Sequence, residues 1–224
     1  MMRFPMMALA GLAALPALAA DRLPLAGDEL YCVGFLRDPD IDACTRLIEA
    51  ALGGVALSER YFSRGNAYAL IDELDHAISD YDEAIRLNPQ YADAFNNRGL
   101  VHQQKGDIDR AIADLSRAIR LSPNELDFLN NRGGAYCVKG EFKRALRDLD
   151  AAIRLHPRDA RAFYQRGKVH ARKGDPGRAL ADLTEAIRLR PDYADAFEDR
   201  AALYREQGQG ARADADFEAA RRLR

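Results

Sequence analysis

Apolar positions along the chain recur with the spacing of paired helices, and the pattern repeats every 34 residues. In one copy, Ile108–Ile119, the apolar residues stand three or four positions apart, which predicts one apolar face of a helix. Gly106 interrupts the chain before this helix, Asp107 is placed to cap it, and Pro123 stops it. A preceding helix is expected over about Ala92–Lys105. Each copy is therefore predicted to be a helix pair.

Four columns of identical residues establish the repeat. Their members are Pro89, Pro123, Pro157 and Pro191, then Gly65, Gly99, Gly133 and Gly167, then Ala77, Ala111, Ala145, Ala179 and Ala213, then Ala84, Ala118, Ala152, Ala186 and Ala220. A fixed period of this length is the sequence signature of stacked repeats. The glycines fall inside each first helix, where glycine is about 1 kcal/mol less favourable than alanine. We therefore predict that they permit close approach of the paired helix.

These columns resemble the tetratricopeptide repeat (TPR) family, whose signature runs aromatic, leucine-glycine, tyrosine, alanine, aromatic, alanine and proline. One unit of this chain matches it with Tyr61, Gly65, Tyr68, Ala77, Tyr81, Ala84 and Pro89. The resemblance covers five units, at residues 58–91, 92–125, 126–159, 160–193 and 194–224. It implies an all-α fold, a right-handed α-solenoid of helix-turn-helix repeats. One departure is systematic, because arginine replaces the family's leucine before the glycine.

The first 19 residues predict a cleavable signal peptide. Arg3 precedes the apolar run Met6–Leu18, and Ala17 and Ala19 place small residues where a signal peptidase reads them. The run is too short for a membrane span, which needs about twenty residues. We expect a periplasmic or secreted protein, of a bacterial type, with no membrane insertion after signal removal.

Residues 20–57 predict a degenerate helical pair that caps the N-terminal end of the stack. Ile41, Cys44 and Leu47 give its second helix an apolar stripe. An exported protein meets an oxidising compartment, and Cys32 and Cys44 flank a turn-like stretch at Pro39. We expect these two cysteines to form a disulfide.

Two charged columns also keep the period. They are Arg64, Arg98, Arg132, Arg166 and Arg200, and Asp80, Asp114, Asp148, Asp182 and Asp216. One interpretation is an arginine row for an anionic ligand. The other is a structural ion-pair ladder, in which each arginine on a first helix meets an aspartate on the packed second helix. Identical spacing in all five units favours the ladder, because a ligand seldom needs every repeat equally.

Few other residues carry candidate chemistry. A net charge of −2 gives no reason to expect nucleic acid as a partner. His102 and His170 stand two units apart, too far to share a metal ion, and no cofactor motif is present. Cys137 is the one possible nucleophile, although activation would need a neighbouring base or cation. We expect no metal and no cofactor.

A repeat solenoid presents an extended concave surface, and the TPR resemblance implies that particular columns of the first helices line it. The residues of this predicted peptide-binding groove are Phe62, Asn66, Asn96, Asn97, Asn130, Asn131, Arg161, Tyr164, Gln165, Lys168 and Arg172. Amide side chains both donate to and accept from a peptide backbone. The three cations suit an acidic group or a C-terminus.

The sequence thus predicts a non-enzymatic protein–protein interaction scaffold that binds an extended peptide or protein segment. The partner's identity and the oligomeric state stay open. Two alternatives remain: a thiol- or cation-dependent enzyme accessory role centred on Cys137 and the basic fourth repeat, or a self-assembling structural protein.

Overall fold

The structure, a computed structural model, describes residue 32, residues 40–51 and residues 54–224. The predicted signal peptide lies outside the described residues. All regular secondary structure in the described part is helical. The helices are α2 (Ile41–Ala50), α3 (Gly54–Leu70), α4 (Leu74–Leu87), α5 (Ala92–Gln104), α6 (Ile108–Leu121), α7 (Leu126–Lys139), α8 (Phe142–Leu155), α9 (Ala160–Arg172), α10 (Pro176–Leu189), α11 (Ala194–Glu206) and α12 (Gly210–Arg222).

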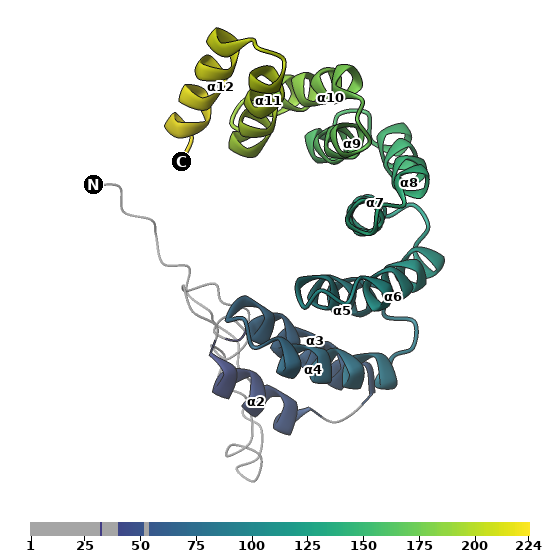
Figure 1. Cartoon of the computed structure of the whole chain (residues 1–224). Coiled ribbons are helices and arrows are strands. Elements are labelled where there is room, and N and C mark those ends of the chain that lie inside the picture. The colour runs from purple at the N-terminus through teal and green to yellow at the C-terminus, as the bar shows by residue number, and fades with distance from the viewer. Residues whose placement is uncertain (1–31, 33–39, 52–53) are drawn as a thin grey trace, which may run out of the picture.

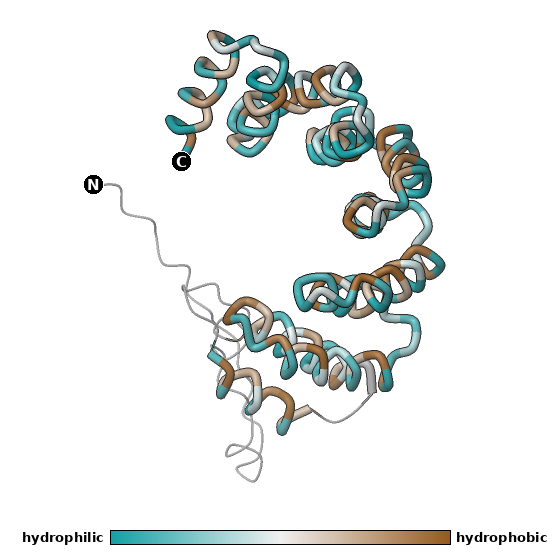
Figure 2. Tube along the Cα trace, viewed as in Figure 1, coloured by the Kyte–Doolittle hydropathy of each residue, from teal (hydrophilic) through white to brown (hydrophobic). Residues whose placement is uncertain are grey.

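The helices stack in sequential antiparallel pairs that follow an arc (Figure 1). In the middle of the arc, α5, α7 and α9 lie on the inner, concave side, and α6, α8 and α10 lie on the outer, convex side. The predicted α-solenoid of helix-turn-helix repeats is confirmed. Each helix buries an apolar stripe against its neighbours, and Figure 2 shows hydrophobic and hydrophilic residues interleaved around the helices. Among the described helices, none is long and apolar enough to cross a bilayer.

The turn inside each helix pair depends on a left-handed residue. Gly106, Gly140 and Gly174 all have φ of 82°, and Gly208 has φ of 72°. Glycine adopts this conformation without steric cost, so the first helix ends there and the chain reverses. The first pair departs from the pattern, because Asp72 occupies the same repeat position with φ of 64°.

The mid-helix glycines do allow close approach. A Cβ atom added at Gly133 would lie 2.8 Å from Cγ of Leu149, which is fully buried on the partner helix. An added Cβ at Gly65 would lie 2.8 Å from the Tyr81 ring. Because real Cβ contacts are longer than this, a side chain here would force the paired helices apart.

At the N-terminal end, α2 packs against α3 and extends the stack. The apolar contact consists of Cys32, Cys44 and Leu47 with Ala67 of α3. The Cys32 and Cys44 sulfur atoms lie 2.21 Å apart, at disulfide distance, and their Cα atoms are 4.7 Å apart. Only part of the predicted cap at residues 20–57 falls within the described residues.

Candidate functional site

The concave surface carries a continuous chain of side-chain hydrogen bonds that crosses three repeats. Asn97 of α5 donates to Oδ1 of Asn66 on α3 (2.8 Å), and the Tyr81 hydroxyl donates to the same oxygen (2.8 Å). Asn96 donates to Asn97 (2.9 Å), and Asn131 of α7 donates to Asn96 (2.9 Å). Each amide uses only some of its donors and acceptors in these hydrogen bonds. The half-buried amides of Asn66, Asn97 and Asn131 can therefore form further hydrogen bonds toward the groove.

Not every predicted groove residue is accessible. Asn130 is only 1% exposed, and its Nδ2 donates to Oδ2 of Asp159 (3.0 Å) at the α8–α9 turn. Its Oδ1 has no hydrogen-bond partner among the described residues. Asn96 is 6% exposed and Tyr164 8% exposed. These three side chains therefore point into the seams between helices, because their column faces the adjoining unit as much as the groove.

The same column is aromatic at the two ends of the predicted groove. The Phe62 ring lies 4.8 Å from that of Tyr91, and the Tyr164 ring lies 4.7 Å from that of Tyr193. Asn96 and Asn130 replace the aromatic residue in the two units between them. In this column polar side chains are therefore confined to the middle of the arc, between two aromatic contacts that join the flanking units.

The three predicted cations of the fourth unit differ in what they already bind. Arg161 forms an ion pair with Asp127 of α7. Arg172 donates through Nη1 to the Cys137 carbonyl (2.6 Å). Lys168 lies with its Nζ 5.1 Å from the centre of the Tyr164 ring and has no ion pair within the described part of the chain. Lys168 is therefore the cation best able to receive a new anionic group.

The predicted groove residue Gln165 belongs to α9 and is half-buried. Its Oε1 lies 4.0 Å from the position that a Cβ on Gly134 of α7 would occupy.

Sequence reasoning missed three exposed apolar residues on the inner helices. Leu70 is 70% exposed, Leu100 37% and Val138 49%. Leu100 shares a repeat position with Asn66 and Lys168, while Leu70 and Val138 share one with Arg172. The signal that could have revealed them is their place in the same repeat columns as the predicted polar groove residues. The concave surface thus offers apolar contacts beside the amides.

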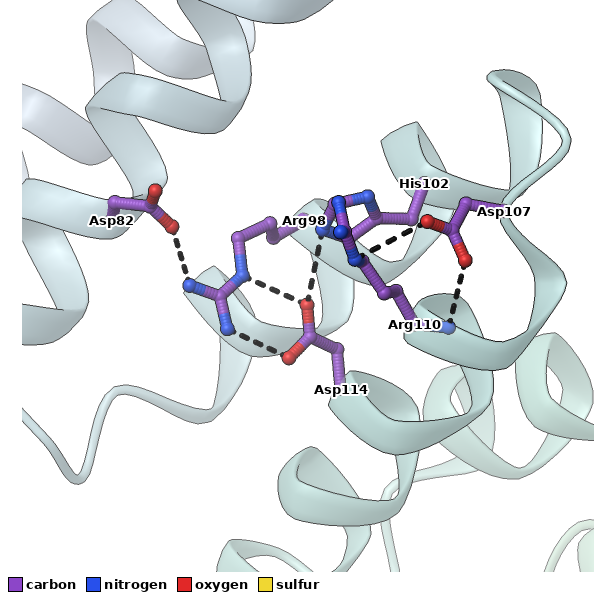
Figure 3. Close-up of polar contacts among 6 residues, drawn as sticks. All are labelled: Asp82, Arg98, His102, Asp107, Arg110 and Asp114. Atoms are coloured by element: carbon purple, nitrogen blue, oxygen red, sulfur yellow. Dashed lines mark hydrogen bonds and ion pairs between the residues drawn. The ribbon is translucent and has the colours of Figure 1, made fainter.

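The arginine and aspartate columns meet in all five units. Arg98 donates through Nε and Nη2 to the two carboxylate oxygens of Asp114, at 2.8 and 2.7 Å (Figure 3). The same two bonds join Arg64, Arg132, Arg166 and Arg200 to the aspartate sixteen residues later. Such bidentate pairs orient both groups strongly. The arginines are therefore occupied within the protein rather than aimed at a ligand.

Each of these arginines also makes a third bond, through Nη1, to the preceding helix layer. The acceptor is Asp82 for Arg98 and Asp150 for Arg166. It is the hydroxyl of Thr45 for Arg64, of Ser116 for Arg132 and of Thr184 for Arg200. The ladder therefore joins neighbouring units as well as the two helices of one unit. Figure 3 shows Arg98 between Asp114 and Asp82, which come from different units.

Cys137 has a cation beside it, as an activated thiol requires. Arg172 Nη1 lies 3.7 Å from its Sγ, although the side chain of Cys137 is only 6% exposed. His102 and His170 are buried near Asp114 and Asp182, with the nitrogen and oxygen atoms 3.9 Å apart in each pair. Burial lowers the pKa of both histidines. No group of three potential metal ligands occurs within the described residues.

Comparison with solved structures finds the same fold in several bacterial proteins. A tetratricopeptide repeat protein from Parabacteroides merdae ATCC 43184 is 20% identical, with a TM-score of 0.70 over 80% of this chain and 70% of its own. TTC0263, a thermophilic TPR protein in Thermus thermophilus, is 25% identical, with a TM-score of 0.65 over 73% of this chain and 89% of its own. YrrB, described as a TPR protein with an unusual peptide-binding site, is 24% identical, with a TM-score of 0.59 over 83% of this chain and 94% of its own. No curated protein matches the chain in sequence.

Three family models match the repeats. Two described as tetratricopeptide repeat match residues 92–125 and 133–197, and one described as TPR repeat matches residues 65–106. Together they cover more than half of the 224 residues. The family models and the helix pairs with their 34-residue period agree, and the chain belongs to the tetratricopeptide repeat family.

Proposed function

We propose that this protein is a non-enzymatic interaction scaffold whose concave surface binds an extended segment of a partner protein. The observation that carries the proposal is the amide chain from Asn66 to Asn131, set beside the exposed Leu100 and Val138. Amides that are held in place by one another present donors and acceptors in fixed positions, so that an extended backbone can bind them without a large loss of side-chain entropy. Apolar side chains of the segment would cover the two aliphatic residues.

The positive charges of the fourth unit indicate where an acidic group of the bound segment would lie. Lys168 has no ion pair among the described residues and lies one repeat beyond Val138 along the arc. An acidic side chain or a C-terminal carboxylate would bind there, with Arg172 close by in the next turn of α9. Arg161 contributes less to this proposal than its charge suggests, because Asp127 already pairs with it. The peptide binding described for YrrB is consistent with this use of the fold.

The predicted signal peptide extends the proposal to location. A scaffold with residues 1–19 removed would act in a bacterial periplasm or outside the cell, on partners in that compartment. Fractionation of cells that produce the full chain, with mass spectrometry of its N-terminus, tests this. A cytoplasmic chain that keeps residues 1–19 would contradict the proposed location but leave the groove proposal standing.

Peptide selection followed by matched variants tests the groove. Random twelve-residue peptides are selected on the purified protein, and the affinity of the best one is measured by fluorescence anisotropy. We expect Lys168→Ala to weaken binding about tenfold, which is the loss of one charge-assisted contact. Lys173→Ala is the control, because Lys173 is an exposed cation without an ion pair in the described structure and lies one turn away at the end of the same helix. Equal effects of the two changes would refute the assigned binding surface.

The thiol-dependent alternative rests on the contact between Arg172 and Cys137. Burial of Cys137 counts against it, because a nucleophile must reach its substrate. The rate of iodoacetamide alkylation in the native protein decides the matter. Rapid, pH-independent alkylation between pH 6 and pH 8 would revive this alternative, and slow alkylation would remove it.

A further inference from the structure

The outward face of α8 carries a row of cations that no acidic side chain neutralises. Lys143, Arg147 and Arg154 share one side of the helix, because spacings of four and seven residues correspond to about one and two helical turns. Arg158 follows in the turn to α9. All four are exposed, and none has an ion pair with any residue that the structure describes. Asp150 lies on the same helix, but Arg166 already occupies its carboxylate (2.7 Å).

This row, which we call the α8 stripe (Lys143, Arg147, Arg154 and Arg158), is not a consequence of the repeat. The same repeat positions hold Asp75, Ser79, Arg86 and Gln90 in the first unit, Asp109, Ala113, Arg120 and Asn124 in the second, and Gly177, Ala181, Arg188 and Asp192 in the fourth. Each of those sets contains a single cation, whereas the third unit has cations at all four positions. Like charges one turn apart destabilise a helix, so the stripe suits a partner that brings negative charge.

The wider charge distribution points to an acidic partner. Residues 126–193 contain fifteen Lys or Arg and nine Asp or Glu, and residues 58–91 contain three and seven. The acidic first unit of a second copy is a poor match for the stripe, because all of its exposed carboxylates except that of Glu59 are already bonded. Asp75 pairs with Lys105, and Glu83 with Arg86. An excess of positive charge over two adjacent units draws an acidic molecule toward this part of the arc.

An apolar pocket lies at the end of the α8 stripe. It has a volume of about 530 Å³ and is lined by Leu126, Leu155, His156, Pro157, Arg158 and Asp159. Leu155 is 41% exposed. Leu126 occupies a repeat position that is alanine in the second, fourth and fifth units, so its contribution to the lining is particular to the third unit, whereas the Leu155 and Pro157 positions recur in other units. Arg158 belongs to both the stripe and the pocket, which makes them one continuous surface.

We propose that the α8 stripe and this pocket form a second docking surface for an acidic segment of a partner protein. Carboxylates of the segment bind along α8, and one apolar side chain enters the pocket beside Leu155. The exposed residues of α8 offer no aromatic ring for stacking of a nucleobase and one aliphatic side chain for insertion into a bilayer. A protein segment with both kinds of side chain therefore fits better than nucleic acid or lipid. Because α8 lies on the outer side of the arc, the α8 stripe is separate from the groove, whereas the pocket lies at the α8–α9 turn beside the start of α7 and shares no residue with the predicted groove (Figure 1).

An array of fourteen-residue peptides tests the proposal. Each peptide carries four glutamates three or four positions apart and one leucine, whose place varies from peptide to peptide. We expect the best peptides to bind the full chain with an affinity that falls as sodium chloride rises from 50 to 500 mM. Arg147→Glu with Arg154→Glu should weaken binding at least tenfold, and Leu155→Ser should weaken it severalfold. The matched control is Arg86→Glu with Arg222→Glu, which makes the same charge change at the repeat position of Arg154 in the first and last units and should alter binding less than twofold.

The remaining outcomes contradict the proposal. Binding of no peptide in the array would overturn it. So would equal losses of affinity in the variant that combines Arg147→Glu with Arg154→Glu, called the α8 pair, and in the control variant. Tighter binding to vesicles of phosphatidylcholine and phosphatidylglycerol, or to duplex DNA, that is abolished by the α8 pair would reassign the surface to that ligand. Sedimentation of a dimer that the α8 pair converts to monomer would make a second copy the occupant. Circular dichroism of every variant checks that the helices are retained, and Lys168→Ala should leave binding to this surface unchanged.

Discussion

Arg132 and Asp148 are joined by two parallel hydrogen bonds of 2.7 and 2.8 Å, although one belongs to α7 and the other to α8. Their side chains are 19% and 7% exposed. The Arg132 guanidinium also lies over the Tyr136 ring, 5.7 Å from its centroid. This ion pair takes the place that an aliphatic residue has in the family's signature, so it should behave as part of the core.

We predict that Asp148→Ala lowers the free energy of unfolding by about 3 kcal/mol, because it leaves the largely buried Arg132 charge without a counter-charge. Urea unfolding followed by circular dichroism measures this. Arg144→Ala, which breaks an exposed pair with Glu141, should cost less than about 1 kcal/mol. Combining Asp148→Ala with Arg132→Leu should recover much of the loss, because no charge then stays stranded. A double variant as unstable as Asp148→Ala alone would show that the loss comes from packing and not from charge.

Gly133→Ala should destabilise the protein by about 1 kcal/mol. The new Cβ would lie 2.8 Å from Leu149 Cγ, and overpacking of this kind costs about 1–3 kcal/mol, which exceeds the gain of up to about 1 kcal/mol in helix propensity. The next residue provides the control. A Cβ at Gly134 meets nothing nearer than Gln165 Oε1 at 4.0 Å, so Gly134→Ala should stabilise by up to about 1 kcal/mol. The same sign of effect at both positions, in thermal unfolding, would contradict the close-approach explanation.

Stability should fall as the pH drops below the ordinary histidine range. Burial lowers the pKa of His102 in the folded protein, against an opposing effect of Asp114 and with a smaller lowering by Arg98. The unfolded chain, with an ordinary pKa near 6.5, then binds more protons than the folded chain does at mildly acidic pH. The stability that is linked to the uncharged form of His102 is therefore fully present above about pH 6.5 and is lost as the pH falls toward the lowered pKa of the folded state.

Replacing both buried histidines by tyrosine, the family's residue in this column, checks the pH effect. The comparison is urea unfolding of the parent protein and of His102→Tyr with His170→Tyr, at pH 7.5 and at pH 5. We expect the double variant to lose less stability between the two pH values. The control is His76→Gln, the same kind of change at an exposed histidine. An unchanged pH dependence in the double variant would assign the effect to carboxylates.

The cysteines should respond differently to reduction. For chain produced in an oxidising compartment, we predict one titratable thiol after unfolding without reductant, from Cys137, and three after reduction. Loss of the Cys32–Cys44 link, which closes a short loop, should destabilise the α2 region by about 2–3 kcal/mol. Hydrogen exchange should detect this in α2 and not in α12. Three thiols before reduction would show that the two sulfur atoms are not bonded in the protein as produced.

The period of 34 residues by itself determined the helix pairs, the turns and the stacking order, because each unit must bury its apolar stripe on the next. The repeat also placed each arginine sixteen residues before its aspartate, and sixteen residues bring the second helix back beside the first. These features depend on local spacing, which a sequence displays directly.

Tertiary structure decided which side chains remain free. Asn130 and Asn131 are neighbours with the same chemistry, yet Asn130 is buried against Asp159 while Asn131 faces the groove amides. Arg161 and Lys168 are both cations of one helix, and only Lys168 lacks an ion pair in the described structure. Such differences depend on the residues that neighbouring units bring alongside, at separations of about one repeat. The columns of the repeat predict that neighbouring units meet, but packing decides which of their polar groups are already paired.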